Sequence, residues 1–351
     1  MMNVPVWVLG VGSLWVLGVT GVRAGEAGAP AGAPARPDPF MGQYGGNYRP
    51  TAGAGATATG YVMGRKDGYG IVVTTGPLRA ALAAPAAAAG ETYLEFGAKP
   101  VDGRLSFAGT VAGTAWAGTC DGNTLVCRGD GPGGGTLDLA YTVPRSPTLE
   151  LPPPPGAIVL LGRDSARTDL AQRWTNAQWP VLADGSVQVG KGSNYTTDPI
   201  GDMQLHLEFL TPYEPAESAQ TRGNSGVYIQ DRYEIQILDS FGLRPGAGDC
   251  AAIYRVRPPD VNVTAPPLVW QTYDISFRAA TFREDGTWAS EPEVTVLHNG
   301  VKVHDRVRLT APTGAGRERH KDKPHVPSDK LQLQEHGHPV RFRNVWYTKL
   351  E

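Results

Sequence analysis

Charge is scarce in this chain, and neither sign is in clear excess. Charged residues make up 19% of the 351 residues, and 32 basic against 34 acidic side chains leave a formal net charge of −2. A protein with an isoelectric point near 6.4 has no global electrostatic attraction for nucleic acid. We therefore expect no nucleic-acid partner.

Long helical segments are also lacking. The chain contains 45 Gly and 30 Pro, which are poor helix formers, and no long segment repeats its apolar residues with a period of 3.6. This excludes a helix bundle or a coiled coil. The hydrophobic content of 41% is nevertheless enough for a core. We expect an all-β protein whose short strands are separated by turns rich in Gly and Pro.

Cysteine is rare, with three residues in the whole chain, and no CxxC or clustered Cys/His pattern predicts a structural zinc site. Cys120 and Cys127 flank Asp121-Gly122-Asn123, which is a hairpin-turn signature. The two thiols either form a disulfide across that hairpin or remain unpaired. We expect Cys250 to be a small buried apolar residue.

The apolar run near the N-terminus is short for a membrane span. Val4 to Val19 carries no charge, and Val22-Arg23-Ala24 has apolar or small residues at the positions that signal peptidase reads. We interpret residues 1–24 as a signal peptide, which predicts export to the periplasm or the extracellular space and no membrane span in the mature chain. Because no Lys or Arg precedes the run, an uncleaved anchor is the alternative.

Two stretches rich in Pro divide the rest of the chain. Residues 25–39 form an Ala/Gly/Pro-rich spacer, and residues 144–155, with four consecutive prolines at 152–155, form a second linker. Residues 40–143 are predicted to be a small β-rich domain that contains no His. Residues 156–351 hold all seven His and alternate polar and apolar residues, which favours an antiparallel two-sheet sandwich.

Polar side chains alternate along two neighbouring predicted strands of the second domain. Only Asp231-Arg232 separates the two runs, so they are expected to form a hairpin whose polar residues share one sheet face. Such a face resembles a sugar-binding groove, whereas the alternative is an ordinary solvated sheet face. The side chains expected on this face are Arg222, Asn224, Tyr228, Glu234 and Gln236, joined by His206 and Glu208 from the preceding strand.

Several motifs of the second domain, in the same order along the chain, resemble the 3-keto-disaccharide hydrolase domain family. The turn Leu161-Gly162-Arg163-Asp164 departs from the Phe-Asp-Gly-like turn of that family. Residues 40–143 resemble the N-terminal region of some members more loosely. The segments that carry the resemblance are Gln204–Phe209, Arg222–Tyr228, Tyr233–Ser240, Trp270–Ile275, His298–Val301, Leu331–Gly337 and Pro339–Trp346.

The resemblance implies a concanavalin A-like jelly roll in which two curved antiparallel sheets form a concave carbohydrate site. It also implies action on 3-keto-glycosides by elimination, by hydration of the resulting glucal, or by net hydrolysis. A ketone at C3 makes the C2 proton acidic, so a positioned base can remove it while the C1 substituent leaves. This route does not need the two carboxylates of an ordinary glycosidase.

Such a site needs a base, a group that stabilises the oxyanion and groups that hold the hydroxyls. Our hypothesis is that Glu234 or His336 is the base, and that Arg222 with Asn224 or Gln236 stabilises the oxyanion. A divalent metal with His and carboxylate ligands is the alternative for the second role, and no other cofactor is required. The residues expected to bind substrate are Asn224, Tyr228, Gln236, Glu208, His206, Gln334 and Arg341.

Two other functions remain open from the sequence. A jelly roll also serves non-catalytic carbohydrate-binding modules, because one fold supports many functions. A conventional endo-glucanase is the second alternative, although Glu234 is followed by Gln236 and Leu238 rather than by further acids.

Overall fold

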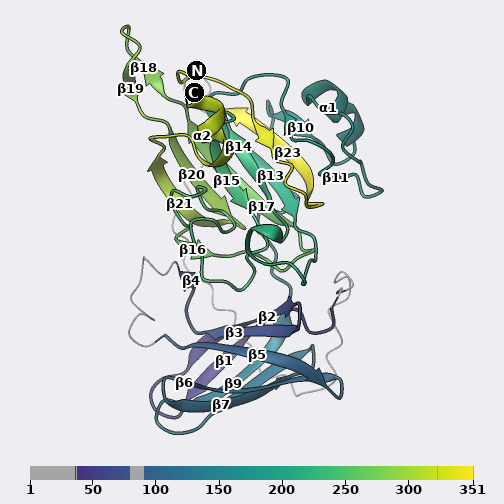
Figure 1. The fold of residues 1–351 in the computed structure, drawn as a ribbon, viewed down its shortest axis with the longest axis vertical. Helices are drawn as coiled ribbons and strands as arrows, with labels where there is room; N and C mark the ends of the chain where they lie inside the picture. Colours follow the sequence, from purple (N-terminus) through teal and green to yellow (C-terminus); the bar gives the residue numbers. More distant parts are fainter. Residues whose placement is uncertain (1–35, 37, 80–90, 322, 351) are drawn as a thin grey trace. The chain divides into compact units, whose positions relative to one another are not determined.

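The structure of the chain is a computed structural model that describes residues 36, 38–79, 91–321 and 323–350. Nearly all regular structure in these residues is β-strand, as Figure 1 shows, so the all-β fold class is confirmed. The predicted signal peptide, residues 1–24, lies outside the described residues, and so does most of the 25–39 spacer.

The first part of the described chain is an eight-stranded antiparallel barrel. Consecutive strands pair with each other, and the first strand closes the barrel by pairing with the last. Alternate apolar side chains, such as Val62, Ile71, Leu105 and Leu125, fill its core, and each contributes roughly 1.5–3 kcal/mol by leaving water. The barrel strands are β1 (Gly42–Pro50), β2 (Ala56–Arg65), β3 (Gly68–Thr74), β5 (Tyr93–Val101), β6 (Arg104–Val111), β7 (Thr114–Cys120), β8 (Thr124–Gly129) and β9 (Gly135–Thr142).

All three cysteines are free and buried. In the β7–β8 hairpin, Cys120 is paired with Leu125 and Cys127 with Gly118, so the two cysteines do not stand opposite each other. The disulfide alternative for Cys120 and Cys127 is therefore wrong. The expectation that Cys250 is a small buried apolar residue is confirmed, since it belongs to the core of the second part.

We expect these thiols to react slowly with Ellman's reagent in the native protein. Burial raises the pKa of the Cys127 thiol to about 12 and that of Cys250 to about 11, which keeps them protonated. Titration without reductant, before and after unfolding in guanidinium, should show the count rise to the three thiols of the sequence. A count of one after unfolding would contradict the free state of Cys120 and Cys127.

The second part is a sandwich of two antiparallel sheets, which is the predicted jelly-roll architecture (Figure 1). The larger sheet has the order β10 (Ile158–Leu161), β23 (Arg341–Lys349), β13 (Met203–Leu210), β17 (Gln271–Arg278), β20 (Glu293–His298) and β21 (Val301–Arg308), with β11 (Val187–Gln188) also paired to β23. The smaller sheet has the order β12 (Asn194–Tyr195), β22 (Gln332–Leu333), β14 (Ser225–Ile229) and β15 (Tyr233–Ile237).

The core of the sandwich takes alternate residues of its strands, which are the odd-numbered ones in β13, β14, β15 and β17. Leu207 and Phe209 of β13, Ile275 of β17, and Val227 and Ile235 of the smaller sheet all belong to one buried apolar cluster. Because successive strand residues point to opposite faces, the even-numbered neighbours in β14 and β15 are turned away from this core. This alternation fixes which side chains reach the face that carries Glu234.

Turn chemistry sets the two hairpins that the sequence predicts. His298 pairs with Val301 across Asn299-Gly300, whose φ angles of 49° and 76° are those of a type I′ turn, so that prediction is confirmed. β14 and β15 pair antiparallel with Ile229 opposite Tyr233, which confirms the second hairpin. The remaining elements are α1 (Ala166–Arg173), η1 (Ala219–Thr221), α2 (Gly314–His320), β18 (Thr281–Phe282) and β19 (Trp288–Ser290).

Contacts between barrel and sandwich residues are partly apolar and partly polar. β4 (Leu78–Arg79) pairs with β16 (Val261–Asn262), and Leu78 is buried with Met63 and Phe241. Asp38, at the end of the predicted spacer, accepts hydrogen bonds from the hydroxyl groups of Tyr69 and Tyr213. Asp38, which the sequence places in the spacer, is therefore bonded to both parts of the described chain.

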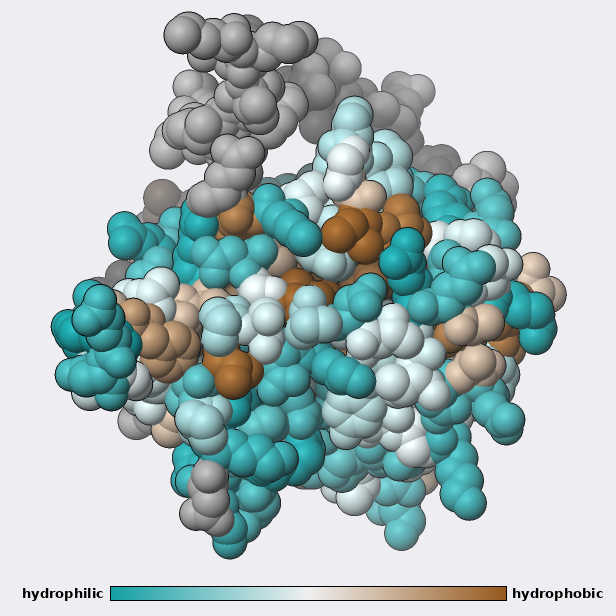
Figure 2. All heavy atoms as spheres, turned by 90° about the horizontal axis from the view of Figure 1, so that it is seen from above, coloured by the Kyte–Doolittle hydropathy of each residue, from teal (hydrophilic) through white to brown (hydrophobic). Residues whose placement is uncertain are grey.

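No helix among the described residues is long and apolar enough to cross a membrane. Figure 2 shows hydrophilic side chains over most of the face that it presents, with apolar side chains in small separate groups. Scattered apolar residues of this kind are ordinary on a protein surface.

Candidate active site

Glu234 and Tyr228 form a directly bonded pair on the smaller sheet. They stand opposite each other in the β14–β15 register, on the face turned away from the core. The Tyr228 hydroxyl donates a hydrogen bond to Oε2 of Glu234 at 2.6 Å. Glu234 is the only acidic residue in the four strands of this sheet. The predicted polar face therefore carries a single carboxylate.

Burial makes the Glu234 carboxyl an unusually weak acid. Its side chain is almost completely buried, with 2% of the residue exposed. Burial raises the pKa of Glu234 to about 7, although the Tyr228 hydrogen bond and the charges of Arg319 and Arg255 act in the opposite direction. A carboxyl with a pKa near neutrality is well matched to remove a proton at neutral pH.

The segment from Thr313 to His320 covers this carboxyl. The Glu234 N–H donates to the Thr313 hydroxyl at 2.6 Å, and the Ala315 N–H donates to the Tyr228 hydroxyl at 3.2 Å. Gly314 has a φ of +50°, and a Cβ there would overlap Oε2 of Glu234. Glycine is therefore required at this position by both its backbone conformation and the close approach of the carboxylate.

The same segment is fastened to the turn of the β14–β15 hairpin. Arg319 contacts Oδ1 of Asp231 at 2.6 Å and donates to the Gln332 side chain at 2.8 Å. His320 contacts the other carboxylate oxygen of Asp231 at 2.9 Å. The guanidinium of Arg319 also lies 4.8 Å from the centre of the Tyr228 ring. These contacts hold the segment in place over Glu234.

Gln220, in η1, connects the amide side chains beside Glu234. Its side-chain oxygen accepts hydrogen bonds from Asn224, Gln236 and Tyr254. Asn224 also donates to the Gln220 backbone carbonyl at 2.8 Å, so its amide nitrogen faces Gln220 and its oxygen is the free end. Asn224 and Gln236, two of the predicted site residues, thus belong to one connected polar network.

Two buried amide oxygens of this face have no hydrogen-bond donor among the described residues. They are Oδ1 of Asn224 and Oε1 of Gln334. A Cβ on Gly226 would lie 2.7 Å from Oε1 of Glu234 and 3.2 Å from Oε1 of Gln334, so these two oxygens converge above the glycine. An unpaired buried acceptor is unfavourable by about 1–3 kcal/mol. Sugar hydroxyl groups are donors that would satisfy such oxygens.

Amide and carboxylate oxygens are also the atoms that hard divalent cations bind. Among the described residues, no group of three or more His, Cys, Asp or Glu side chains is arranged to hold a metal ion. The oxygens of Glu234 and Gln334 that converge above Gly226 are groups of this kind.

Arg222 does not lie beside Glu234, so the predicted arrangement of these two residues is wrong. Its Nε atom lies 2.8 Å from a carboxylate oxygen of Asp239, and both side chains are only 4% exposed. The alternation on which the prediction relied begins at Ser225, because Gly223 has a φ of +62° and the chain there is not yet a strand. The charge of Arg222 is therefore neutralised outside the hairpin.

His336 lies two residues beyond Gln334, in the loop that follows β22, and its side chain is exposed. The neighbouring His338 contacts Glu214 at 2.7 Å. Glu234 is therefore the base candidate that lies within the bonded network of the smaller sheet, while His336 stands at its margin.

His206 and Glu208 belong to β13 in the larger sheet, so the expectation that they join the Glu234 face is wrong. β13 pairs with β17 and β23, whereas β14 pairs with β15 and β22. Adjacency along the chain does not fix which sheet a strand enters. His206 instead contacts Asp274 at 2.7 Å, and Glu208 accepts from Arg343 at 2.7 Å.

This second polar cluster fastens the predicted linker to the larger sheet. The Glu150 N–H donates to Oε1 of Glu208 at 2.5 Å, and Asn344 donates to the Leu151 carbonyl at 2.8 Å. The Ser146 hydroxyl is hydrogen-bonded to Thr272 at 2.6 Å. Residues 146–151 are therefore packed against the sheet rather than serving as a free spacer.

Arg341 also lies away from Glu234, on β23 beside β11. Its Nε atom donates to the Ser186 hydroxyl at 3.0 Å, and its guanidinium contacts Asp184. The expectation that Arg341 shares a substrate site with Glu234 is therefore wrong. Gln334, in contrast, follows β22 and reaches the Glu234 face, and its role in substrate binding stays a prediction.

Sequence reasoning missed several residues that surround Glu234. Gln220, Tyr254, Arg255, Arg319 and the 313–315 segment all come from loops or from α2. They are not part of the strand alternation, so no periodic signal in the sequence marks them. Only the folded chain brings them to this face.

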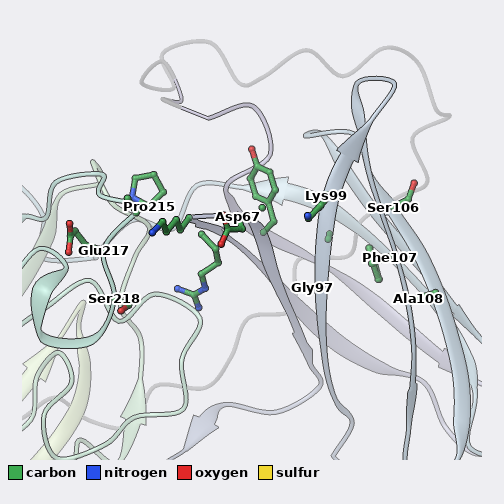
Figure 3. Close-up of a pocket in the computed structure, with 15 residues that line it drawn as sticks. Asp67, Gly97, Lys99, Ser106, Phe107, Ala108, Pro215, Glu217 and Ser218 are labelled. Carbon is green, nitrogen blue, oxygen red and sulfur yellow. The ribbon is translucent and has the colours of Figure 1, made fainter.

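A cavity of about 650 Å³ lies elsewhere, as Figure 3 shows. Barrel residues, including Lys99 and Phe107, line it together with Pro215 and Glu217. It contains no residue of the Glu234 network, and none of its lining acids is buried. We therefore keep the Glu234 face as the candidate active site.

Residues 158–348 match the family described as the 3-keto-alpha-glucoside-1,2-lyase-like domain. Three crystal structures from Parabacteroides distasonis ATCC 8503, each described as a "putative glycosyl hydrolase", are similar to this chain. One is 32% identical, with a TM-score of 0.48 and coverage of 56% of this chain and 85% of its own. A second is 21% identical, with a TM-score of 0.38 and coverage of 55% and 99%. The third is 18% identical, with a TM-score of 0.34 and coverage of 49% and 84%. No curated protein matches.

Proposed function

Because the chain belongs to the 3-keto-alpha-glucoside-1,2-lyase-like domain family, we propose that it is a carbohydrate-active enzyme that cleaves 3-keto-glycosides. Glu234 removes the proton at C2, and the resulting negative charge is delocalised onto the C3 ketone oxygen. The electron pair then forms the C1–C2 double bond as the C1–O bond breaks, and the leaving oxygen takes up a proton. Addition of water to the unsaturated product completes net hydrolysis.

The observation that carries this proposal is the state of the Glu234 carboxyl. Tyr228 fixes Oε2 at 2.6 Å, and Oε1 is directed toward the unpaired oxygen of Gln334 above Gly226. With a pKa raised to about 7 by burial, the carboxyl is both ionised in part at neutral pH and strong enough as a base. The two acceptors, Asn224 and Gln334, would receive the hydroxyls of the sugar.

Substrate access requires movement of the segment 313–320. Glu234 is 2% exposed and Tyr228 is fully buried in the structure. The contacts that fasten this segment are hydrogen bonds and ion pairs to the hairpin residues Tyr228, Asp231, Arg232 and Glu234 and to Gln332. The proposal therefore includes an open state in which α2 has moved away from the hairpin.

The single carboxylate favours elimination over ordinary glycoside hydrolysis. Retaining and inverting glycosidases use a pair of carboxyl groups on either side of the scissile bond, whereas Glu234 is the only acid in the four strands of this sheet. A C3 ketone removes the need for the second carboxyl by making the C2 proton acidic. Export, as the N-terminal sequence predicts, would place the enzyme where glycosides arrive from outside the cell.

Purified protein should release the aglycone from a p-nitrophenyl 3-keto-glucoside and leave the unoxidised glucoside intact. An ultraviolet band of the conjugated enone should appear before hydration, and deuterium at C2 should slow release if proton removal limits the rate. Parallel assays with EDTA and with added Mg²⁺, Ca²⁺ or Mn²⁺ measure metal dependence. Release from an unoxidised glucan would instead identify a glucanase, and binding without turnover would identify a carbohydrate-binding module.

A further inference from the structure

The proposed reaction places negative charge on the C3 oxygen, so a positive group is needed near Glu234 in addition to the base. Stabilisation of a developing oxyanion commonly changes an enzymatic rate by 10²–10³-fold. Arg222, the cation expected from the sequence, is paired with Asp239. Arg319 is already bonded to Asp231 and Gln332. Both guanidinium groups are thus already held by a carboxylate.

Arg255 is exposed and, unlike these two arginines, its side chain is not paired with a carboxylate in the described part of the chain. Its guanidinium has no hydrogen bond or ion pair to any described residue, and it lies 5.3 Å from the centre of the Tyr254 ring. Arg257, two residues later, is in contrast paired with Asp260 at 2.8 Å. Arg255 thus offers a planar set of donors that remains available to a ligand.

Tyr254 connects Arg255 to the carboxyl. The Tyr254 N–H donates to the Glu234 carbonyl at 3.1 Å, and a Cβ on Gly314 would lie 3.0 Å from the Tyr254 ring while overlapping Oε2 of Glu234. The Tyr254 hydroxyl donates to Gln220, which holds the amide network. The ring on which Arg255 rests therefore borders the reacting carboxyl directly.

The backbone also turns sharply at Arg255. Its φ of +58° is in the left-handed region that non-glycine residues seldom adopt, and its N–H is anchored to the Ala247 carbonyl at 2.7 Å. Backbone conformations of this kind are unfavourable and are concentrated at functional sites. The positive charge of Arg255 also lowers the pKa of Glu234, which agrees with its position beside the carboxyl.

We infer that Arg255 binds the C3 oxygen of the substrate and stabilises the enolate formed when Glu234 removes the C2 proton. This inference rests on the proposed function. The guanidinium remains protonated throughout, so it supplies charge and hydrogen bonds but transfers no proton. Arg255, which lies outside the strands, thus takes the oxyanion-stabilising role that the sequence analysis gave to Arg222.

Arg255→Gln should lower kcat on a 3-keto-glucoside by about 10²–10³-fold, with a smaller change in KM. Arg255→Lys should recover part of this loss because it restores the charge without the planar donors. The acid limb of the pH–rate profile should also move to higher pH in Arg255→Gln, since the positive charge that lowers the Glu234 pKa is gone. Arg257→Gln is the matched control, from the same loop and with its charge already paired.

Exchange of the C2 proton with deuterated water measures enolate formation directly and should slow in Arg255→Gln. Wild-type rates of exchange and turnover in that variant would overturn the role of Arg255. If Glu234→Gln is inactive in the same experiment, the proposed function stands without Arg255. If Glu234→Gln is as active as the wild type, Glu234 is not the base, and if the wild-type protein does not cleave 3-keto-glucosides, the proposed function itself fails.

Discussion

Glu234→Gln is expected to reduce kcat/KM on a 3-keto-glucoside by about 10²–10⁴-fold, because an amide cannot accept the C2 proton. The substitution preserves the shape of the side chain and the Tyr228 hydroxyl can still donate to its oxygen, so the fold should be kept. Glu293→Gln is the matched control, since Glu293 lies on β20 and pairs with the exposed Arg306. Initial rates and circular dichroism measure the two effects separately.

Activity and stability are expected to change in opposite directions as pH rises. Activity should rise as pH increases through about 7, where the Glu234 carboxyl ionises. Stability should fall over the range from about 4.5 to about 7, because the folded protein holds a proton there that the unfolded chain has released. Tyr228→Phe should move the activity limb to higher pH, because the Tyr228 hydrogen bond lowers the pKa of Glu234.

Glu234→Gln with at least a tenth of wild-type activity would contradict the assignment of the base. An acid limb that is unchanged in Tyr228→Phe would separately contradict the coupling between these two residues. If Glu234→Gln keeps that activity, the exposed His336 becomes the next base to test, and His336→Ala provides the measurement.

Glu208→Ala is expected to lower the free energy of unfolding by about 3–5 kcal/mol, because it leaves buried polar partners without their acceptor. Glu208 is fully buried and accepts hydrogen bonds from Arg343, Asn344 and the Glu150 N–H. Urea unfolding followed by fluorescence measures the change. Trypsin should also cleave faster after Arg145, since the docked segment loses one of its anchors.

Acid should remove the Glu208 contribution from the wild-type protein. Burial opposes ionisation of this carboxyl, but His206, 3.8 Å from Oε1, and the hydrogen bonds from Asn344 and Arg343 outweigh it and lower the pKa to about 2. The stabilisation is therefore complete above about 4.5 and lost as pH falls toward 2. Glu293→Ala is the control, because its pair with an exposed arginine contributes about 0–1 kcal/mol. Equal stability losses in the two variants would contradict the buried-network argument.

Local patterns predicted the strands and hairpins of the second part well. Alternation assigned Val227, Ile229 and Ile235 to the core and Tyr228 and Glu234 to the opposite face, as the structure has them. Asn299-Gly300 specified its own turn through two positive φ angles. These predictions succeeded because side-chain direction within a strand depends only on neighbouring residues.

Predictions that depended on which strands pair, beyond the two hairpins, were wrong. His206 and Glu208 have the alternation of the other polar strands, but β13 enters the larger sheet. Arg222 precedes the first residue of β14, so its side chain is not governed by that alternation and reaches Asp239. In both cases, contacts between residues distant in the chain decided the outcome.

The sequence by itself determined that the chain is built of short strands, which residues of each strand face the core, and that one polar face carries Glu234. Only the tertiary structure decided which residues surround that carboxyl. Gln220, Tyr254, Arg255 and the 313–320 segment come from loops and short helices that no periodic pattern marks. The physical reason is that alternation is a local property of a strand. The burial that raises the pKa of Glu234 is instead produced by segments distant in the chain, such as that of Thr313, 79 residues further on.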